Sequence, residues 1–380
     1  MTGREFLPLL FWAALLSLAF THVGYPLLMA ALARLRAGSR PQAAPPETPP
    51  LSVVLAAFNE EARIVARLQN LLASDWPPDR LEILVVSDGS TDGTVARVKE
   101  LGDARVRVVD RRERAGKSAC VNAGVAEARG ELVVFCDARQ KFERGTIRQL
   151  ASNFADPAVG AVSGELLIDP AASAVGGGVD AYWKLERFLR TAEARWHSSI
   201  GCTGAVYAIR RALYQTIPDD TLLDDVVIPM HITAAGHRVL YDTSAQAFDS
   251  QPLEPAHERG RKQRTLAGNF QMLVRHPGWL LPWRNGRWWQ LIAHKYLRLA
   301  APLFMAVLLV AGFLLRDAGI VYSLCWWGQC AFYGLAALGM LLPRVRTPLL
   351  SLPAGFVFLH FMVAGGFWNY LRGAYRRGGW

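Results

Sequence analysis

The sequence predicts an α/β domain that lies between apolar helices at the two ends of the chain. Apolar runs occur close to the N-terminus and again in the C-terminal part, and between them short apolar, β-branched runs alternate with stretches of helical periodicity. Strands that are apolar almost throughout and are separated by helices form mostly parallel sheets with both faces covered. We therefore expect a mostly parallel sheet with transmembrane helices before and after it.

The first expected element is a membrane-spanning helix within residues 1–40. Phe6–Ala33 contains no charged residue apart from His22 when it is protonated, and this run can cross a bilayer with some tilt. A signal peptide is the alternative, but its apolar region spans only about 7–15 residues. Three arginines follow the run: Arg34, Arg36 and Arg40. The positive-inside rule then places the next domain in the cytoplasm.

The linker Gln42–Pro50 is rich in Pro and Ala and leads into a domain over residues 51–277. Its first part holds four expected strands: Ser52–Ala57, Glu82–Asp88, Val106–Asp110 and Leu132–Cys136. Three intervals between them have helical periodicity: Glu60–Ser74, Asp92–Leu101 and Lys117–Ala128. Ligands of such sheets bind beyond the carboxyl ends of the strands, so polar residues at those ends are the first site candidates.

About three further spans are expected over residues 299–371. The apolar runs are Leu299–Leu315, Ala318–Leu342 and Pro348–Leu371, each long enough, or nearly so, to cross a bilayer. Residues 278–298 are rich in Trp and Arg, which is typical of an interfacial amphipathic segment. Four spans put the C-terminus outside, whereas three arginines favour the inside: Arg372, Arg376 and Arg377. Either the last run is re-entrant or the charge rule fails there.

The formal net charge of +10 is compatible with nucleic acid, anionic lipid or a phosphorylated substrate as a partner. Membrane spans favour the last two, so no nucleic acid is expected. The five cysteines stand singly, without a CxxC pair, which argues against a zinc site or a disulfide framework.

Asp88 ends the second expected strand and begins a Gly-Ser-Thr-Asp-Gly turn. Its carboxylate can accept hydrogen bonds from a nucleobase or ribose; alternatively, Asp88 and Asp92 cap the turn and the helix. The Gly-Lys-Ser sequence at 116–118 suggests a phosphate-binding P-loop. That motif needs a glycine where Arg111 stands, so the sequence argues against an NTPase.

Seven short segments carry a family resemblance, and in chain order they read AAFNEE, VVSDGSTDGT, GKSACVNAG, VVFCDAR, GCTGAVYAIRR, LLDDVVIP and RKQRTLAGN. Together with the order of span, domain and spans, they resemble the family 2 glycosyltransferases of GT-A fold, the group of the cellulose, hyaluronan and poly-N-acetylglucosamine synthases. The resemblance covers about Leu51–Asn269. It implies a Rossmann-like GT-A catalytic domain, a nucleotide-sugar donor, and Mg²⁺ or Mn²⁺ as a cofactor.

The resemblance implies a donor site whose members are Ala57, Glu60, Asp88, Lys117, Asp137 and Arg139. Asp137 stands where the family's DxD motif binds the metal ion that bridges the diphosphate, and Arg139 replaces the second acid of that motif. Mg²⁺ often takes only one or two protein carboxylates, so Asp137 is the expected metal ligand. The guanidinium of Arg139 can itself neutralise diphosphate charge. The alternative is an Asp137 that merely pairs with Arg139.

Asp224 and Asp225 correspond to the family's Glu-Asp pair, whose second residue is the general base. Inverting transfer needs one carboxylate to take the proton of the attacking hydroxyl, and a neighbouring carboxylate raises the pKa of one of the two. Alternatively, both acids cap a helix expected over Val226–Ala235. An acceptor-site loop is implied as well, although a plain turn is the open alternative, and its residues are Gly201, Cys202, Thr203 and Gly204. Asp224 is grouped with that acceptor site.

Arg264 matches the arginine of the family's QxxRW motif, which is expected to stabilise the leaving diphosphate. Arg261 and Thr265 replace the Gln and the Trp of that motif. The Trp positions the acceptor in processive synthases, so processivity is not implied. A basic run that simply meets anionic lipid is the alternative.

The expected function is inverting transfer of a sugar from a nucleotide sugar, foremost a UDP-sugar, to a polysaccharide or cell-envelope glycan. The expected protein is a multi-pass protein of the cell (inner) membrane with its catalytic domain in the cytoplasm. Single-sugar transfer to a lipid, such as an isoprenoid phosphate or a sphingolipid, is the second hypothesis, favoured by Thr265 and by only three C-terminal spans. A non-catalytic export subunit is the third, and Arg139 is the one feature that favours it.

Overall fold

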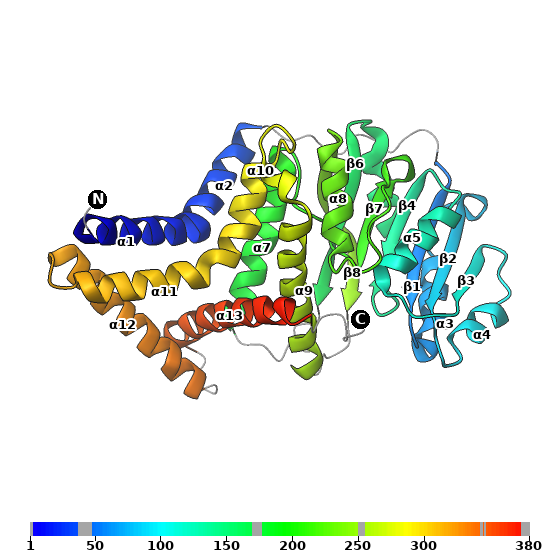
Figure 1. Ribbon diagram of the computed structural model, residues 1–380. Coiled ribbons are helices and arrows are strands. Elements are labelled where there is room, and N and C mark those ends of the chain that lie inside the picture. The colour runs from blue at the N-terminus through cyan, green and yellow to red at the C-terminus, as the bar shows by residue number, and fades with distance from the viewer. Residues whose placement is uncertain are drawn as a thin grey trace.

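The computed structural model describes residues 3–36, 48–168, 177–249, 255–342, 345 and 347–373. The sheet lies at one side of the molecule and the apolar helices at the other, with two long helices between them (Figure 1). Some positions interpreted above lie outside the described residues: Arg40, residues 42–47, Arg376 and Arg377, and also the side chain of Arg261.

The eight strands in the described part of the chain form one sheet, in the order β3-β2-β1-β4-β7-β6-β8-β5. The strands are β1 Leu51–Ala57, β2 Leu81–Asp88, β3 Val106–Arg111, β4 Leu132–Cys136, β5 Lys141–Phe142, β6 Val159–Ile168, β7 Val206–Arg210 and β8 Arg238–Asp249. Strands β3, β2, β1 and β4 are parallel, and β7 is antiparallel to both of its neighbours. The four strands predicted from the sequence are present, and the predicted mostly parallel sheet is confirmed.

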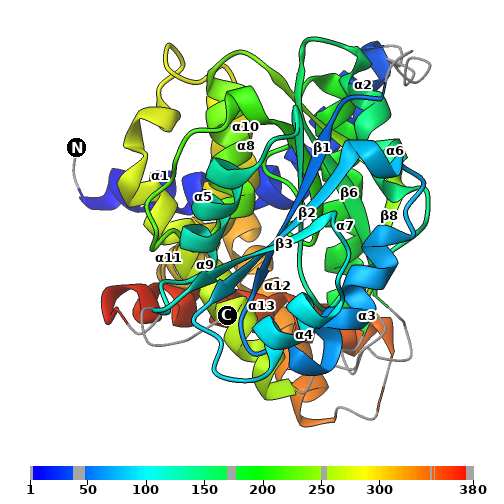
Figure 2. The ribbon, with the colours of Figure 1, turned by 90° about the vertical axis from the view of Figure 1, so that its right-hand side faces the viewer.

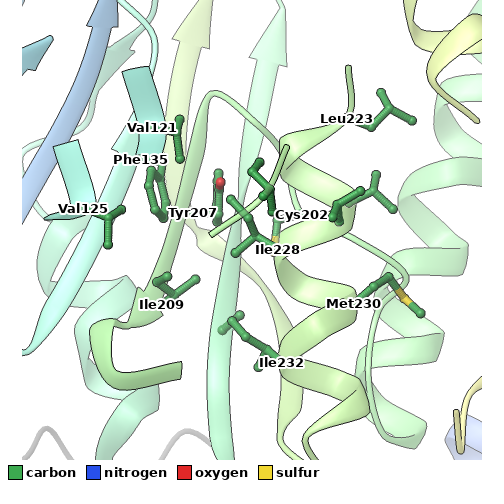
Figure 3. Close-up of a cluster of buried hydrophobic side chains, with 14 of the residues drawn as sticks. Val121, Val125, Phe135, Cys202, Tyr207, Ile209, Leu223, Ile228, Met230 and Ile232 are labelled. Atoms are coloured by element: carbon green, nitrogen blue, oxygen red, sulfur yellow. The ribbon is translucent and has the colours of Figure 1, made fainter. Parts of the chain in front are cut away.

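Helices cover both faces of this sheet (Figure 2). One face packs against α3 Glu61–Leu72, α4 Thr94–Glu100 and α6 Thr146–Ser152, and the other against α5 Lys117–Glu127 and α8 Asp224–Ala234. Alternation along β1 explains the two cores, because Val53 and Leu55 face the first set while Val54 and Ala56 face the second. Figure 3 shows the second core, in which Phe135 stacks on Tyr207 with ring centroids 4.6 Å apart.

Within the described residues, four helical stretches are long and apolar enough to cross a membrane: Phe6–Leu35, Trp288–Leu315, Ile320–Leu341 and Pro348–Leu371. The first contains α1 Gly3–Ala19, the π-helical turn η1 Phe20–Gly24 and α2 Tyr25–Leu35. The second contains α10 Trp288–Leu291, the π-helical turn η7 Ile292–Tyr296 and α11 Leu297–Leu315, and the last two are α12 and α13. The described residues also contain short 3₁₀ turns: η2 Pro78–Arg80, η3 Asn153–Ala155, η5 Arg211–Leu213 and η6 Pro277–Leu280.

The structure differs from the expected boundary at residue 298, because the helical stretch already begins at Trp288. Part of the expected interfacial segment is therefore continuous with α11. The physical reason is that the basic residues of this part have protein partners: His294 and Arg298 contact the carboxylate of Glu186. Charges that are paired inside the protein do not need a position in the aqueous interface.

Two helices, α7 Gly177–Trp196 and α9 Pro255–Arg275, lie between the sheet and the apolar helices (Figure 1). The last part of α13 packs along α9, where the rings of Phe270 and Phe367 lie 5.1 Å apart and a side chain at Gly366 would clash with Leu266. The C-terminal end of α13 therefore lies beside the sheet domain, which is the side that the C-terminal arginines favour.

Gly124 of α5 offers a test of the helix–sheet packing. A Cβ atom there would lie 2.4 Å from Val54 Cγ1 and 3.1 Å from Val86 Cγ2. We expect Gly124→Ala to lower the free energy of unfolding by about 1–3 kcal/mol, because overpacking a tight core costs that much. The measurement is chemical denaturation of the detergent-solubilised protein.

Gly260 of α9 provides the matched control, since it is exposed and no atom lies within 4 Å of the Cβ position. Gly260→Ala should be neutral or stabilise the protein by up to about 1 kcal/mol, because Ala favours the helix. Equal effects of the two substitutions would contradict the close contact of α5 with the sheet.

Candidate active site

Lys117, the first residue of α5, joins the end of β4 to the start of α8. Its Nζ atom lies 2.7 Å from Asp137 Oδ1 and 4.0 Å from Asp224 Oδ2. Burial by itself lowers the pKa of Lys117, but the charges of Asp137 and Asp224 more than offset it, so this pKa lies above its usual value. A donor-site residue and an acceptor-site residue predicted separately from the sequence therefore share one cation.

Asp88 holds the loop that leads into α5. It is completely buried, and its carboxylate accepts hydrogen bonds from the N–H groups of Ala115 (2.8 Å) and Gly116 (3.0 and 3.1 Å). Gly116 has a φ of 97°, which favours glycine. The Asp88 side chain has no exposed surface in this structure that could make the expected direct contact with a base or ribose. Asp88 instead fixes the backbone immediately before Lys117.

Asp224 and Asp225 are the first two residues of α8, and its N-cap residue is Leu223. The alternative that both acids cap the helix is therefore wrong, because the helix begins two residues earlier than expected. Burial, and then the charge of Asp224, raise the pKa of Asp225 to about 6. A carboxyl group with this pKa is ionised at neutral pH and basic enough to take a proton.

The loop from Gly201 to Gly204 packs directly against Asp225. The N–H group of Cys202 donates to the Asp225 carbonyl at 2.7 Å. A Cβ atom on Gly204 would lie 2.9 Å from Asp225 Oδ2, so only glycine leaves room for the carboxylate. Thr203 Oγ1 accepts a hydrogen bond from Arg190 Nη1 of α7 at 3.0 Å. The structure thus brings the predicted acceptor loop and the predicted base together.

Arg139 pairs with the buried carboxylate of Asp249 at the end of β8. The same Asp249 oxygen also accepts a hydrogen bond from Gln140 Nε2 at 3.0 Å. The alternative that Asp137 merely pairs with Arg139 is therefore wrong, since Asp137 pairs with Lys117. Because Asp249 already balances the charge of Arg139, the expected role of Arg139 in neutralising diphosphate loses support.

Arg67 is a site residue that the sequence analysis missed. It is 2% exposed, and its Nε donates to the Asp137 carbonyl at 3.1 Å, so it holds the peptide group that carries the Asp137 side chain. Its guanidinium lies 4.3 Å from the ring centroid of Phe142. The sequence does contain a signal for this residue: Arg67 follows Ile64 by three positions and so lies on the apolar face of α3, where a charged residue is unusual.

Among the described residues, three predicted residues make no hydrogen bond or ion pair with Lys117, Asp137, Asp224 or Asp225. Ala57 is buried at the end of β1, and the Glu60 carboxylate pairs with Arg63 at 3.1 Å. Arg264 is partly buried on α9 and makes no hydrogen bond or ion pair with the part of the chain that the structure describes. Its guanidinium is therefore available to an anion.

Residues 52–217 match the family model described as glycosyl transferase family 2. The chain carries a family 2 glycosyltransferase domain. The family predicted from the sequence and its GT-A fold are thereby confirmed. A mannosyltransferase from Pyrobaculum calidifontis, solved in complex with GDP-Man and Mn²⁺, shares this fold: its TM-score is 0.73 at 24% identity, over 95% of this chain and 99% of that one.

Curated relatives resemble this chain mainly around the glycosyltransferase domain. Probable glycosyltransferase YdaM of Bacillus subtilis is 28% identical over 220 residues, which cover 54% of this chain and 52% of the relative. Beta-monoglucosyldiacylglycerol synthase of Synechocystis sp. is 32% identical over 199 residues, which cover 48% of this chain and 40% of the relative. The chain thus spans about half the length of these relatives.

Asp88→Asn tests whether this residue positions the Lys117 loop. Asparagine keeps one acceptor oxygen but turns an amide N–H toward backbone donors, so the amides of Ala115 and Gly116 should exchange hydrogen at least about tenfold faster, since hydrogen bonds to a charged group contribute about 1.5–3 kcal/mol. Hydrogen exchange read by mass spectrometry measures this. Asp110→Asn, at an exposed position, is the control, and unchanged protection in Asp88→Asn would contradict the assignment.

Proposed function

We propose that the chain is an inverting glycosyltransferase that moves a sugar from a nucleotide-sugar donor, foremost a UDP-sugar, to the hydroxyl group of an acceptor. The observation that carries this proposal is Asp225, a carboxyl group of raised pKa beside a glycine-lined loop. The cation of Lys117 links this acceptor side to Asp137 at the end of β4. A single displacement at a sugar carbon requires a base for the attacking hydroxyl, and Asp225 is proposed to supply it.

In this mechanism Asp225 takes the proton of the attacking hydroxyl as the bond between the sugar and the diphosphate breaks. Gly204 has no side chain that would press on this carboxylate, since a Cβ atom there would lie 2.9 Å from Asp225 Oδ2. Negative charge grows on the diphosphate during the same step. The group proposed to stabilise it is the guanidinium of Arg264, which has no hydrogen bond or ion pair within the described residues. Lys117 stays charged throughout, because Asp137 and Asp224 hold its proton.

A divalent cation, Mg²⁺ or Mn²⁺, fits this site only together with the donor. No group of three or more His, Cys, Asp or Glu side chains able to hold a metal occurs within the described ranges. Asp137 is 34% exposed and has one oxygen on Lys117, so it offers one carboxylate. Mg²⁺ is often bound by one or two carboxylates plus substrate phosphates. Bound in this way, the ion would supply positive charge to the leaving diphosphate.

We further propose a multi-pass protein of the cell (inner) membrane whose catalytic domain faces the cytoplasm. Four apolar helical stretches support the membrane location. Arg34 lies in the last turn of the first stretch and Arg36 follows it, where Arg36 Nη1 donates to the carbonyl of Trp196 at the end of α7. The positive-inside rule assigns this end of the stretch to the cytoplasm.

The acceptor is proposed to be a polysaccharide or another cell-envelope glycan, and a lipid is the second candidate. One observation favours the lipid: the acceptor loop bonds to Arg190 of α7, which packs beside the apolar helix α2. An acceptor headgroup at the membrane surface would therefore reach Asp225 over a short distance. Among the relatives, beta-monoglucosyldiacylglycerol synthase bears a glycolipid name and poly-beta-1,6-N-acetyl-D-glucosamine synthase of Staphylococcus aureus a polysaccharide name.

The direct experiment incubates the purified protein in lipid with a panel of nucleotide sugars and measures the release of nucleoside diphosphate. One donor should give release that increases when the right acceptor is added. Sizing the product then separates a polymer from a single addition. Absence of release with every donor and acceptor class would overturn the proposed activity.

Asp225→Asn tests the base, because asparagine keeps the shape of the side chain and removes the proton acceptor. The turnover rate should fall by about 10²–10⁴-fold while donor affinity persists. In the wild type, the rate should rise with pH through about 6, where Asp225 loses its proton. Steady-state kinetics and calorimetry with the nucleotide sugar measure these effects.

Asp224→Asn is the matched comparison. Removing its charge lowers the pKa of Asp225, so the acid limb of the rate profile should move to lower pH. The loss of rate at neutral pH should be much smaller than for Asp225→Asn. If both variants fold and bind donor but Asp224→Asn loses more rate than Asp225→Asn, then Asp225 is not the base and Asp224 is.

The donor side gives a prediction about metal dependence. Excess chelator should lower transfer strongly, because a single carboxylate and the diphosphate share the ion. Calorimetry should find only weak Mn²⁺ binding to the protein without nucleotide and tighter binding with it. Full activity in excess chelator would show that protein cations alone carry the diphosphate charge.

A further inference from the structure

A buried polar cluster connects the apolar helices with the acceptor loop, and we name it the α7 cluster. Its members come from α7 and from both apolar stretches that pack on it, and they are Tyr25, Glu186, Arg190, Glu193, His294, Lys295 and Arg298. Glu193 and His294 are completely buried. Carboxylates are stable inside a protein only where cations and hydrogen-bond donors compensate them. The two glutamates therefore hold the side chains that compensate them in fixed positions.

Glu186 and Glu193 of α7 form hydrogen bonds with residues of the apolar helices. The Tyr25 hydroxyl donates to Glu193 Oε1, and His294 Nδ1 lies 2.7 Å from the same oxygen. His294 Nε2 lies 3.0 Å from Glu186 Oε2, which also accepts from Arg298 Nη1 at 2.8 Å. One helix from each end of the chain is therefore bonded to α7.

Arg190 connects Glu186 with the acceptor loop through two hydrogen bonds. Its Nε donates to Glu186 Oε1 at 3.2 Å, and its Nη1 donates to Thr203 Oγ1 at 3.0 Å. Burial lowers the pKa of Arg190, but the charge of Glu186, the hydrogen bond to it and the nearby Tyr241 and Asp225 together outweigh burial, so the pKa lies above the usual value and the guanidinium stays charged. Thr203 is also fixed from the sheet, because its N–H donates to Ser163 Oγ at 2.8 Å.

The backbone of both apolar stretches departs from regular α-helix where they meet α7. The π-helical turn η1 ends immediately before Tyr25, and η7 contains His294 and Lys295. π-Helical turns are rare and occur frequently at functional sites. Each turn shifts the side chains that follow it around the helix, and here those side chains reach the two glutamates.

The charge of Arg190 also acts on Asp225. The titratable and charged groups around Asp225 come from α5, α7, α8, η7 and the neighbouring strand and loop: Lys117, Arg190, Asp224, Lys295, Cys202 and Tyr207. Burial and Asp224 raise the pKa of Asp225, and Lys117, Arg190 and Lys295 lower it, in that order. Loss of the Arg190 charge would leave Asp225 protonated at higher pH.

We propose that Arg190 is a positioning residue of the transfer reaction, which holds Thr203 and the acceptor loop against Asp225 and is itself held, through Glu186, by the apolar helix that carries His294 and Arg298. This inference rests on the proposed glycosyl transfer for its kinetic consequences. Its structural part, the placement of the acceptor loop, stands without that activity.

The kinetic test compares Arg190→Gln and Arg190→Lys with Arg195→Gln in the full chain reconstituted in lipid. Arg195 is an exposed arginine of the same helix and serves as the charge-matched control. In Arg190→Gln the acid limb of the rate profile should move upward by roughly half to one pH unit, since a nearby opposite charge lowers a carboxyl pKa. The acceptor KM should rise roughly tenfold with the donor KM unchanged.

Arg190→Lys separates the two effects. Lysine keeps the charge, so the acid limb should return to its wild-type position, whereas the acceptor KM should stay high because the short bond to Thr203 is lost. Thermal unfolding checks that every variant is folded. An unshifted acid limb and an unchanged acceptor KM in a folded Arg190→Gln would overturn the proposal, as would the same shifts in Arg195→Gln.

A second measurement needs no activity. Cys202 lies beside Thr203 and is 2% exposed, so a maleimide should label it slowly in the wild type and at least about tenfold faster in Arg190→Gln, with the rate of Arg195→Gln unchanged. Labelling is read at Cys202 by peptide mass spectrometry. Equal labelling in Arg190→Gln and the wild type would overturn the positioning role. A wild type that labels as expected but transfers no sugar would refute the proposed function alone.

Discussion

The ammonium group of Lys117 makes the two ion pairs on which the rest of the site depends. It lies between Asp137 at the end of β4 and Asp224 at the start of α8, so it holds together two segments almost ninety residues apart in the chain. Without this cation, the carboxylates of Asp224 and Asp225 would lose the largest positive charge that offsets their repulsion, and only the weaker effects of Arg190 and Lys295 on Asp225 would remain. Asp88 and Gly116 fix the loop from which Lys117 emerges, and Arg67 fixes the peptide of Asp137.

The apolar helices are an integral part of this domain. The core under α5 and α8 continues into Met272 of α9, Leu291 of α10 and Tyr296 of η7, and the α7 cluster adds polar bonds across the same boundary. Because interiors are close-packed, a shift of the helix that carries His294 would be felt at Glu186 and Arg190. In the positioning role proposed for Arg190, the apolar helices help to set where the acceptor loop lies, in addition to the membrane attachment proposed for them.

Periodicity and motifs sufficed to predict the sheet, the GT-A fold and the four apolar stretches, because buried strands and membrane spans leave a strong apolar pattern. Contacts between distant segments could not be predicted. Arg139 stands two residues from Asp137, yet its partner, Asp249, lies more than a hundred residues further along the chain. Likewise, Glu186 and Arg190 form an ordinary i, i+4 pair in the sequence, and only the fold places His294 and Thr203 beside them.

If Asp225 activates an acceptor hydroxyl for a single displacement at the sugar carbon, the reaction inverts the anomeric configuration of the donor. The stereochemistry of the product is therefore the decisive measurement. The protein, reconstituted in lipid, would be given its nucleotide sugar and an acceptor, and nuclear magnetic resonance of the first-formed glycoside would determine its anomeric configuration. We expect a configuration opposite to that of the donor. A product that retains the donor configuration would contradict it, because a single displacement with Asp225 as the base cannot give that result.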